Sequence, residues 1–280
     1  MTDASPGGGV VLLLPGMSMN ATTFPDVGTA VVAAEFNGFD GRTDRADKTD
    51  RADKADRADG WSPVMQSYID EVDRLIRTPV WETASRRIVV GHSFGGMLAL
   101  AWLATRPAAA VHGLVLIGCT AGPIYDRARL RIAGAGARAI RIPVGPLMPL
   151  WDAPLVTRIA KLVLGRPRGD GALDFRRYRG RSDLAIGIAG WRMTTAAAKH
   201  SYRAAMQGFD VRQHLHRIDV PAIVLHGTRD AFFAPAVARD LADGLPQARL
   251  QLIEGAGHML PLSHPGAVER AVADLSPRTP

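Results

Sequence analysis

The sequence predicts an α/β protein: a mostly parallel β-sheet flanked by helices, with a helical cap inserted between two strands. Three observations support this fold class. Short apolar runs alternate along the chain with helical segments. The apolar runs are continuous, which is typical of parallel strands buried on both faces. The alternation lapses once, between residues 120 and 207, where we expect a long insertion.

The expected strands are short and rich in Val, Leu and Ile. Pro221 precedes one of them, and Gly91 and Gly118 each follow another, as is typical of residues that bound strands. The predicted strands are Val10–Leu14, Ala30–Phe36, Arg87–Val90, Leu114–Ile117, Ala222–Leu225 and Arg249–Ile253. Strands that alternate with helices in this way form a mostly parallel sheet with helices on both faces.

The helix expected over residues 62–77 carries clear start signals. Ser62 can cap its first turn, Pro63 suits that turn, and apolar residues recur at positions such as Tyr68 and Val72. Further helices are predicted at Gly95–Thr105, Pro235–Asp243 and Pro265–Leu275, with helix-like segments at Leu155–Leu164 and Ile186–Met206. The last two segments lie in the insertion and make it helical.

Chain length and the lapse in the pattern together predict the domain organisation. The 280 residues suit one α/β domain with an insertion better than two independent domains. We expect a core formed by residues 1–119 and 208–280 and a helical cap or lid formed by residues 120–207. Because the cap interrupts the chain between two strands, it should lie above the ends of the strands.

One segment of the expected core is of low complexity. Residues 44–60 read DRADKTDRADKADRADG, a near-repeat that alternates Asp with Arg or Lys and contains no large apolar residue. Such a segment cannot bury a core face, so we expect a solvated surface loop or a frayed helix with ion pairs. Its repeat is far shorter than the repeats of solenoid proteins, so it does not indicate a repeat fold.

Positive charge is concentrated in the insertion. The chain has 34 basic and 27 acidic residues, a formal net charge of +7. Between Ile124 and Arg181 there are 13 Arg or Lys against 4 Asp, a net charge of +9. A basic segment can attract an anionic substrate, a coenzyme A thioester or an acidic carrier protein. A solvated arginine-rich surface explains the same charge, so both interpretations stay open.

The expected location is the cytoplasm. Cys119 is the sole cysteine, so no intrachain disulfide can form, which fits a reducing compartment. Residues 1–9 contain no Lys or Arg, and the apolar run that follows is too short for the core of a signal peptide. No stretch approaches the roughly 18 apolar residues of a membrane span.

The strongest local signal is the pattern Gly-x-Ser-x-Gly at residues 91–95, with Ser93 at its centre. In this motif a strand turns sharply into a helix, and the serine occupies strained backbone at the tip. Small residues two positions to either side let the strand and the helix approach each other. Residues 86–90 are strand-like and residues 97–101 are helix-like, which is the context that the motif needs.

From about Val10 to Leu275 the chain resembles the α/β-hydrolase superfamily, because three motifs follow in the family's order. Ser93 comes first, a strand-His-Gly-x-x-Asp segment then ends at Asp230, and a glycine-rich loop ends at His258. The resemblance implies that Ser93 is the nucleophile and His258 the general base. It implies that Asp230 orients the histidine and stabilises the imidazolium.

The resemblance also implies an oxyanion hole formed by two backbone N–H groups, those of Phe94 and Met17. Phe94 follows the serine, and Met17 lies in the loop after the first strand. Many relatives have His-Gly where this chain has Pro15 and Gly16. This departure keeps the N–H donor of Met17 but changes how the loop is held.

The other histidines and a nearby aspartate have weaker contexts. His92 neighbours Ser93 in sequence, so its side chain is expected to point away into the packing between helix and sheet. His226 ends a strand and His264 precedes a helix, so both are expected to be structural. Asp219 precedes a strand and is therefore expected at the opposite end of the sheet from Asp230.

Several function classes have little support in the sequence. Relatives that open epoxides or remove halide resemble this fold but have Asp where Ser93 stands. No His, Cys, Asp and Glu cluster has metal-ligand spacing. No phosphate-binding glycine–lysine motif or dinucleotide fingerprint is present, because the triple glycine at residues 7–9 precedes the first strand. We therefore expect neither a cofactor nor a metal.

The expected function is hydrolysis of a carboxylic ester or thioester of a small organic substrate through an acyl-serine intermediate. Carbon–carbon bond hydrolases, lyases and cofactor-free haloperoxidases use a similar triad and stay open as alternatives. A non-catalytic ligand-binding protein on the hydrolase fold is an alternative of another class, against which the complete set of three residues argues. Basic residues without a recognition motif argue against nucleic-acid binding.

Overall fold

The computed structural model describes residues 8–36, 61–106, 110–124, 129–132, 140–143 and 173–276. The low-complexity segment 44–60 and the helix expected at Leu155–Leu164 lie outside these residues. Within the described residues, no helix is long and apolar enough to cross a membrane.

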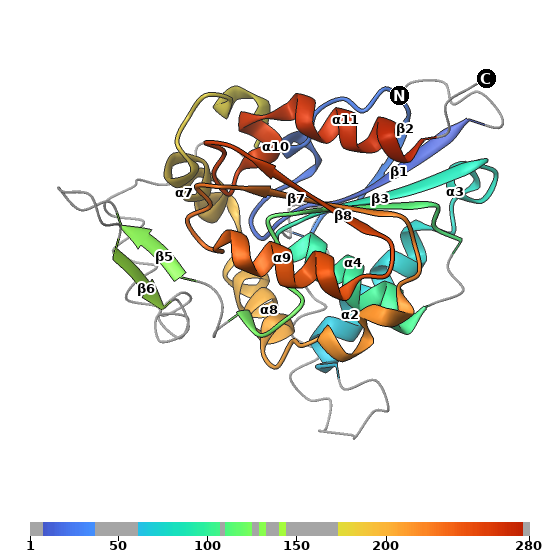
Figure 1. The fold of residues 1–280 in the computed structure, drawn as a ribbon, viewed down its shortest axis with the longest axis horizontal. Coiled ribbons are helices and arrows are strands. Elements are labelled where there is room, and N and C mark those ends of the chain that lie inside the picture. Colours follow the sequence, from blue (N-terminus) through green and yellow to red (C-terminus); the bar gives the residue numbers. More distant parts are fainter. Residues whose placement is uncertain are drawn as a thin grey trace.

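Six parallel strands form the central sheet, in the order β2-β1-β3-β4-β7-β8 (Figure 1). The strands are β1 (Gly9–Leu14), β2 (Ala30–Ala33), β3 (Arg86–His92), β4 (Gly113–Ile117), β7 (Ala222–Gly227) and β8 (Ala248–Ile253). Helices cover both faces of this sheet, which confirms the predicted α/β fold class.

One predicted strand is too long. Ala30–Phe36 was expected to be extended throughout, but β2 ends at Ala33, which pairs with Leu13 of β1. The partner strand runs out there, because β1 ends at Leu14 and Pro15 has no N–H with which to continue a ladder. After β2 the side chains of Ala34 and Phe36 are buried in the core, whereas Glu35 between them is exposed.

Side chains alternate between two apolar layers along each central strand. On β1, for example, Leu12 belongs to one buried cluster and Val11 to the other. The first layer packs against helices α2 (Pro63–Leu75), α4 (Phe94–Thr105) and α9 (Pro235–Gly244), and the second against α11 (Pro265–Leu275). Figure 1 shows α11 along one face of the sheet and α4 and α9 along the other. Both faces of the sheet are therefore buried, as the continuous apolar strands predicted.

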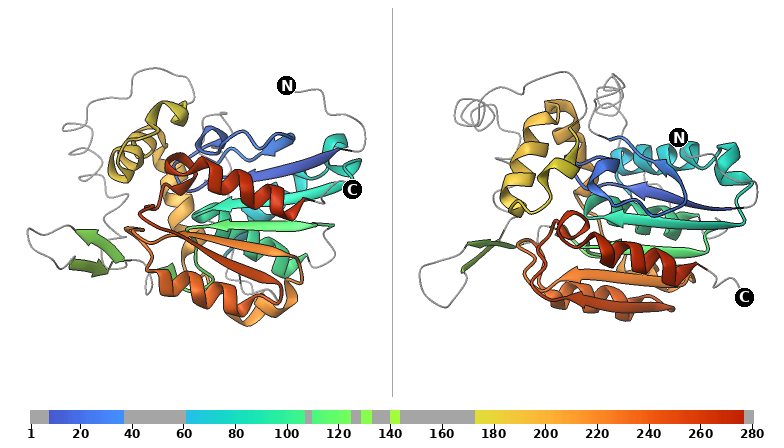
Figure 2. Two further views of the ribbon diagram at one scale, coloured as in Figure 1. Left: turned by 45° about the horizontal axis from the view of Figure 1, so that its top comes forward. Right: turned by 90° about the horizontal axis from the view of Figure 1, so that it is seen from above.

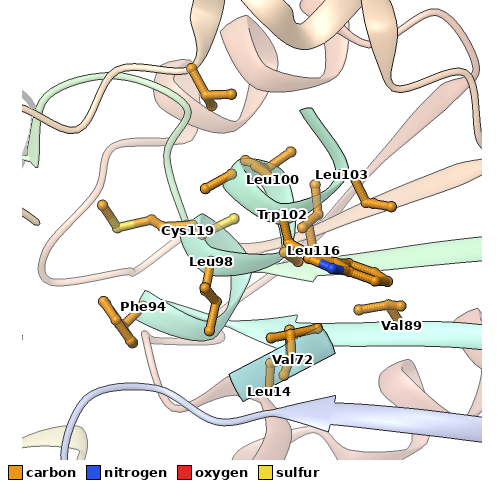
Figure 3. Close-up of a cluster of buried hydrophobic side chains, with 14 of the residues drawn as sticks. Leu14, Val72, Val89, Phe94, Leu98, Leu100, Trp102, Leu103, Leu116 and Cys119 are labelled. Atoms are coloured by element: carbon orange, nitrogen blue, oxygen red, sulfur yellow. The ribbon is translucent and has the colours of Figure 1, made fainter. Parts of the chain in front are cut away.

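Helix α4 is apolar on all sides and is buried from Phe94 to Ala104. Figure 3 shows Leu98 and Leu103 of this helix among side chains of the neighbouring elements, with Trp102 beside them. The indole Nε1–H of Trp102 donates to Oδ1 of Asp73 in α2 at 2.8 Å. Packing on every side fixes the start of α4, and Ser93 lies directly before that start.

The described part of the segment between β4 and β7 contains two α-helices and an antiparallel pair of strands. Helices α7 (Asp183–Met193) and α8 (Ala196–Met206) lie beyond one end of the sheet (Figure 2). The expected single segment Ile186–Met206 is divided at Thr195, whose side chain caps α8 by accepting from the amide of Ala198 at 3.1 Å. Strands β5 (Arg129–Ile132) and β6 (Ile140–Pro143) form an antiparallel pair that the sequence did not predict.

Short helices complete the described chain. They are η1 (Ala21–Thr23), α3 (Pro79–Glu82), η3 (Phe175–Tyr178), η4 (Arg212–Arg217) and α10 (Leu260–Ser263). Their lengths of three to six residues explain why the periodicity of the sequence did not reveal them.

Gly95→Ala should destabilise the protein, because a Cβ there would lie 1.9 Å from the carbonyl oxygen of Leu14, a backbone atom. We expect the free energy of unfolding to fall by roughly 1–3 kcal/mol or more, as in other overpacked sites. Chemical denaturation measures it. Gly187→Ala is the matched control, since Gly187 is also helical but has nothing within 4 Å of the added Cβ. That variant should be neutral or stabilised by up to about 1 kcal/mol; equal losses in both variants would contradict the close approach.

Candidate active site

The loops that carry the predicted site residues meet at one edge of the sheet. After β1 the chain moves outward to β2, and it then returns to the other side of β1 as β3. Strand order therefore reverses between β1 and β3, and ligands of open α/β sheets bind outside the carboxyl ends of strands at such a point. Ser93 follows β3, and Gly16 follows β1.

Ser93 lies in a strained turn between β3 and α4. Its backbone angles are φ 52° and ψ −116°, outside the regions that non-glycine residues ordinarily occupy. The Ser93 amide donates to the carbonyl of Ile117 in β4 at 2.8 Å, which ties the turn to the sheet. A Cβ on Gly91 would lie 2.7 Å from the carbonyl oxygen of Gly95, so the strand and helix approach as closely as the motif predicted.

The structure brings together Ser93, His258 and Asp230, which come from three separate loops. Nε2 of His258 is 3.0 Å from Oγ of Ser93, and Nδ1 of His258 is 2.8 Å from Oδ2 of Asp230. His258 is 5% exposed and Asp230 is 1% exposed, whereas Ser93 is only partly buried. The hydroxyl is thus the accessible end of a chain of hydrogen bonds that leads into the protein.

Asp230 is fixed by the backbone of its own turn. Its Oδ1 accepts the amides of Phe232 and Phe233 at 2.7 and 2.9 Å, which leaves Oδ2 for the histidine. Burial, the largest influence, raises the pKa of Asp230, but the charge and hydrogen bond of His258 and further contacts outweigh it. The net effect lowers the pKa, so the carboxylate stays ionised.

The interaction that lowers the pKa of Asp230 raises the pKa of His258. Burial is again the largest influence and lowers its pKa, but the charge and hydrogen bond of Asp230, with the charge of Asp183, raise it above the usual 6.5. The ring of Phe232 lies edge-on to the imidazole, with centroids 4.7 Å apart. The apolar neighbour shields the pair from water and strengthens its electrostatic interaction.

The two segments predicted to form an oxyanion hole both lie beside Ser93. Phe94 is the first residue of α4, and its ring is buried against Tyr68 and Tyr202, with centroids 5.1 and 4.9 Å away. On the other side, a Cβ on Gly16 would lie 3.2 Å from Cβ of Ser93, so the loop that carries Met17 touches the serine. The segments that carry the two candidate amides thus lie beside Ser93, and the role of the amides stays a prediction.

His92 is a correction to the sequence prediction. Its ring was expected in the packing between helix and sheet, but it lies against His258, with ring centroids 5.1 Å apart. Nε2 of His92 is 2.9 Å from the carbonyl oxygen of His258. Burial lowers the pKa of His92 to about 3, so the ring is neutral and Nε2–H is the donor. Alternation along β3 carries His92 to the same face as Val90, which is the face of the histidine loop.

His226 and Asp219 lie where the sequence predicted. His226 is fully buried, and its Nε2 is 3.2 Å from the carbonyl oxygen of Phe233. It therefore supports the loop that carries Asp230. Asp219 precedes β7 at the far end of the sheet and accepts from the side chain of Gln247 at 2.6 Å.

No local pattern in the sequence indicates that Asp183 belongs to this site. Its Oδ2 accepts the backbone N–H of His258 at 2.5 Å, from the first turn of α7. The two residues are 75 positions apart, and Asp183 has no motif around it. Its one local signal, Ser182 before a helix, indicates a helix start and not a site.

The arrangement is suited to proton transfer from a hydroxyl. A neutral imidazole can accept the Ser93 proton while the buried carboxylate stabilises the resulting imidazolium. Among the residues that the structure describes, no group of three or more His, Cys, Asp or Glu side chains could hold a metal ion.

The chain belongs to the α/β-hydrolase family. The family's sequence model, described as "Alpha/beta hydrolase family", matches residues 11–271. This match covers all but the first two residues of the sheet, the segment between β4 and β7, and the loops described above. The resemblance inferred from the three motifs is therefore confirmed at the level of the family.

Among curated relatives, a pimeloyl-[acyl-carrier protein] methyl ester esterase from Neisseria meningitidis serogroup C is 30% identical over 191 residues. That alignment covers 67% of this chain and 68% of the relative. The chain is also 42% identical over 77 residues to polyketide synthase ThaQ from Burkholderia thailandensis, which is 28% of this chain and spans 4% of the synthase. Among solved structures, olei00960, a hydrolase from Oleispira antarctica, superposes with a TM-score of 0.65 at 17% identity. This superposition covers 97% of this chain and 92% of that one, and it shows likeness of fold.

The pKa of His258 should lie above 6.5 in the folded protein and should fall in Asp230→Asn. The substitution removes the charge that favours the protonated imidazole, while burial continues to disfavour it. Titration of the imidazole resonances by NMR measures both values. A pKa that does not change in Asp230→Asn would contradict the coupling of the two side chains.

Proposed function

We propose that this protein is a serine hydrolase that cleaves a carboxylic ester or thioester of a small organic substrate through an acyl-serine intermediate. One observation carries the proposal: a partly exposed Ser93 hydroxyl lies 3.0 Å from an imidazole whose other nitrogen lies 2.8 Å from a buried carboxylate. That geometry fits activation of a weak nucleophile by an adjacent, oriented base.

In the proposed first step, Oγ of Ser93 attacks the carbonyl carbon while Nε2 of His258 takes the hydroxyl proton. The carbonyl oxygen gains negative charge, and the backbone N–H groups of Phe94 and Met17 donate to it. When the tetrahedral intermediate collapses, the imidazolium returns the proton to the leaving alcohol or thiol. Water then attacks the acyl-serine with His258 again as base, which releases the acid and regenerates Ser93.

The environment of Asp230 supports this sequence of proton transfers. The carboxylate has a lowered pKa, so it remains charged while His258 gains and loses its proton. Its hydrogen bond to Nδ1 fixes the tautomer in which Nε2 of neutral His258 is free to accept. Preorganised donors at the oxyanion add to the rate, typically by about 10²- to 10³-fold for each donor.

The pimeloyl-[acyl-carrier protein] methyl ester esterase, 68% of whose length aligns with this chain, supports an ester or thioester bond over other bonds. Its name describes hydrolysis of a methyl ester on a carrier-linked acyl group. The net charge of +9 between residues 124 and 181 is compatible with an anionic or carrier-linked substrate of this chain. The reaction as proposed needs no cofactor, and we place it in the cytoplasm, which the single cysteine supports.

Ser93→Ala should abolish turnover, because the alanine has no oxygen to form the acyl intermediate. We expect kcat/KM to fall by roughly 10⁴-fold or more. The measurement is hydrolysis of p-nitrophenyl esters and acyl-coenzyme A thioesters of matched chain length by both proteins. A burst of p-nitrophenol equal to the enzyme concentration would report the acyl-serine directly.

Other outcomes separate the alternatives. Cleavage of activated ketones without ester turnover would favour a carbon–carbon hydrolase or a lyase, and peroxide-dependent halogenation would favour a haloperoxidase. Binding of acyl compounds without turnover of any substrate by the wild type would indicate a ligand-binding protein. Turnover that survives in Ser93→Ala would overturn the serine mechanism.

Replacing exposed arginines of the insertion with glutamine should raise KM for anionic substrates. Arg177, Arg179 and Arg181 are exposed just before α7, so their charges can act on an approaching coenzyme A thioester. We expect a severalfold increase in KM for acyl-coenzyme A at low salt and no change for neutral esters. The matched control replaces Arg239 and Arg270, which are exposed on α9 and α11. Equal increases for neutral and anionic substrates would contradict steering by charge.

A further inference from the structure

The backbone of His258 is held from two sides by two side chains. On one side its carbonyl oxygen accepts from Nε2 of His92, which is part of β3 in the core, at 2.9 Å. On the other side its N–H donates to Oδ2 of Asp183 at 2.5 Å. Asp183 belongs to α7, in the segment inserted between β4 and β7. The placement of the imidazole thus depends on the core and on the inserted segment together.

The contact with Asp183 requires a close approach at Gly257. A Cβ on Gly257 would lie within 2.8 Å of the Asp183 carboxyl carbon, so any side chain there would displace the carboxylate. Asp183 itself is held in the first turn of α7, where Ser182 caps the helix by accepting from the amide of Ala185 at 3.3 Å. A carboxylate in that turn is favoured by the helix dipole as well.

Helix α7 also contacts the loop on the opposite side of Ser93. A Cβ on Gly190 would lie 2.3 Å from the carbonyl oxygen of Ser18, directly after Met17. The chain leading to α7 is tied to the same loop region, because Nδ2 of Asn20 donates to the carbonyl of Leu173 at 2.8 Å. A single helix therefore touches the histidine loop at one end and the loop after β1 near the other.

We propose that Asp183 is a positioning residue through which helix α7 sets the placement of His258 over Ser93. This inference rests on the proposed function, since the placement matters for turnover only if His258 is the base. Asp183 holds the His258 peptide while Gly190 holds the loop of Met17, so movement of α7 displaces the base and one oxyanion donor together.

The Asp183 carboxylate contributes its charge as well as its hydrogen bond. The titratable groups that face His258 are Asp230, Asp183 and His92, and His226 faces Asp230 in turn. Asp183 and Asp230 both favour the protonated imidazole, whereas His92 is neutral. Loss of the Asp183 charge therefore lowers the pKa of His258. It moves the acidic limb of the kcat/KM profile to lower pH.

Two substitutions separate the hydrogen bond from the charge. Asp183→Ala removes both, and we expect kcat to fall by roughly 10- to 100-fold, as is typical of a base displaced by a fraction of an ångström to 1 Å. Asp183→Asn keeps an oxygen that accepts the His258 amide, so it should recover most of kcat. Both variants should shift the acidic limb to lower pH, and KM for small neutral esters should change little.

Gly257→Ala tests the same contact from the other side. Its Cβ displaces the carboxylate without removing it, so the variant should match Asp183→Ala in kcat. Combining the two substitutions should add little to the loss, because both remove one interaction. Additive losses would show that the two residues act independently.

A readout that does not depend on turnover keeps this inference distinct from the proposed function. Exchange of the His258 amide hydrogen should accelerate in Asp183→Ala, and the NMR titration of His258 should shift to lower pH in both Asp183 variants. Asp219→Asn, at the opposite end of the sheet, is the control that should change neither. Unchanged kcat, unchanged His258 pKa and unchanged amide exchange in Asp183→Ala would overturn the inference. Failure of the wild type to turn over esters would count against the proposed function alone.

Discussion

The strained turn at Ser93 is the constraint on which the rest of the site depends. A serine with φ of 52° persists only because its surroundings determine it more strongly than its own backbone preference does. The hydrogen bond from the Ser93 amide to the carbonyl of Ile117 and the close approach of Gly95 to Leu14 hold the turn between three parallel strands. The buried helix α4 holds it from the other side. The Ser93 hydroxyl therefore has a fixed position, and the loops that carry His258 and Asp230 are placed relative to it.

The electrostatics of the site follow from burial combined with pairing. A buried carboxylate or imidazolium by itself would be neutralised, because loss of water disfavours the charged form. Asp230 keeps its charge because it accepts two backbone amides and faces His258. The same pairing raises the pKa of the imidazole, so the two side chains behave as one unit with one shared environment.

The sequence revealed those features that local patterns encode. Ser93 lies in a strand–turn–helix pattern, and Asp230 and His258 each follow the end of a strand. These local patterns predict that the three side chains lie at the same edge of the sheet. The reversed position of His92 and the role of Asp183 were not predicted, because each depends on a contact with His258 made at long range. The early end of β2 likewise depends on where its partner strand stops. Strand pairing and tertiary contacts determine these features, and neither produces a periodic pattern of residues along the chain.

The position of the insertion has a consequence for how this protein can diversify. Strands β4 and β7 are parallel neighbours, so the chain leaves the sheet at the carboxyl end of β4 and returns to it at the amino end of β7, on the opposite edge. Helix α8, the later helix of the segment, buries Tyr202 and Met206 in the core, whereas α7 lies before that part of the chain. Exchange of the part that contains α7 would remove the acceptor for the His258 amide. A grafted segment that changed the substrate would have to supply a new acceptor at that place, which links the evolution of specificity to that of catalytic geometry.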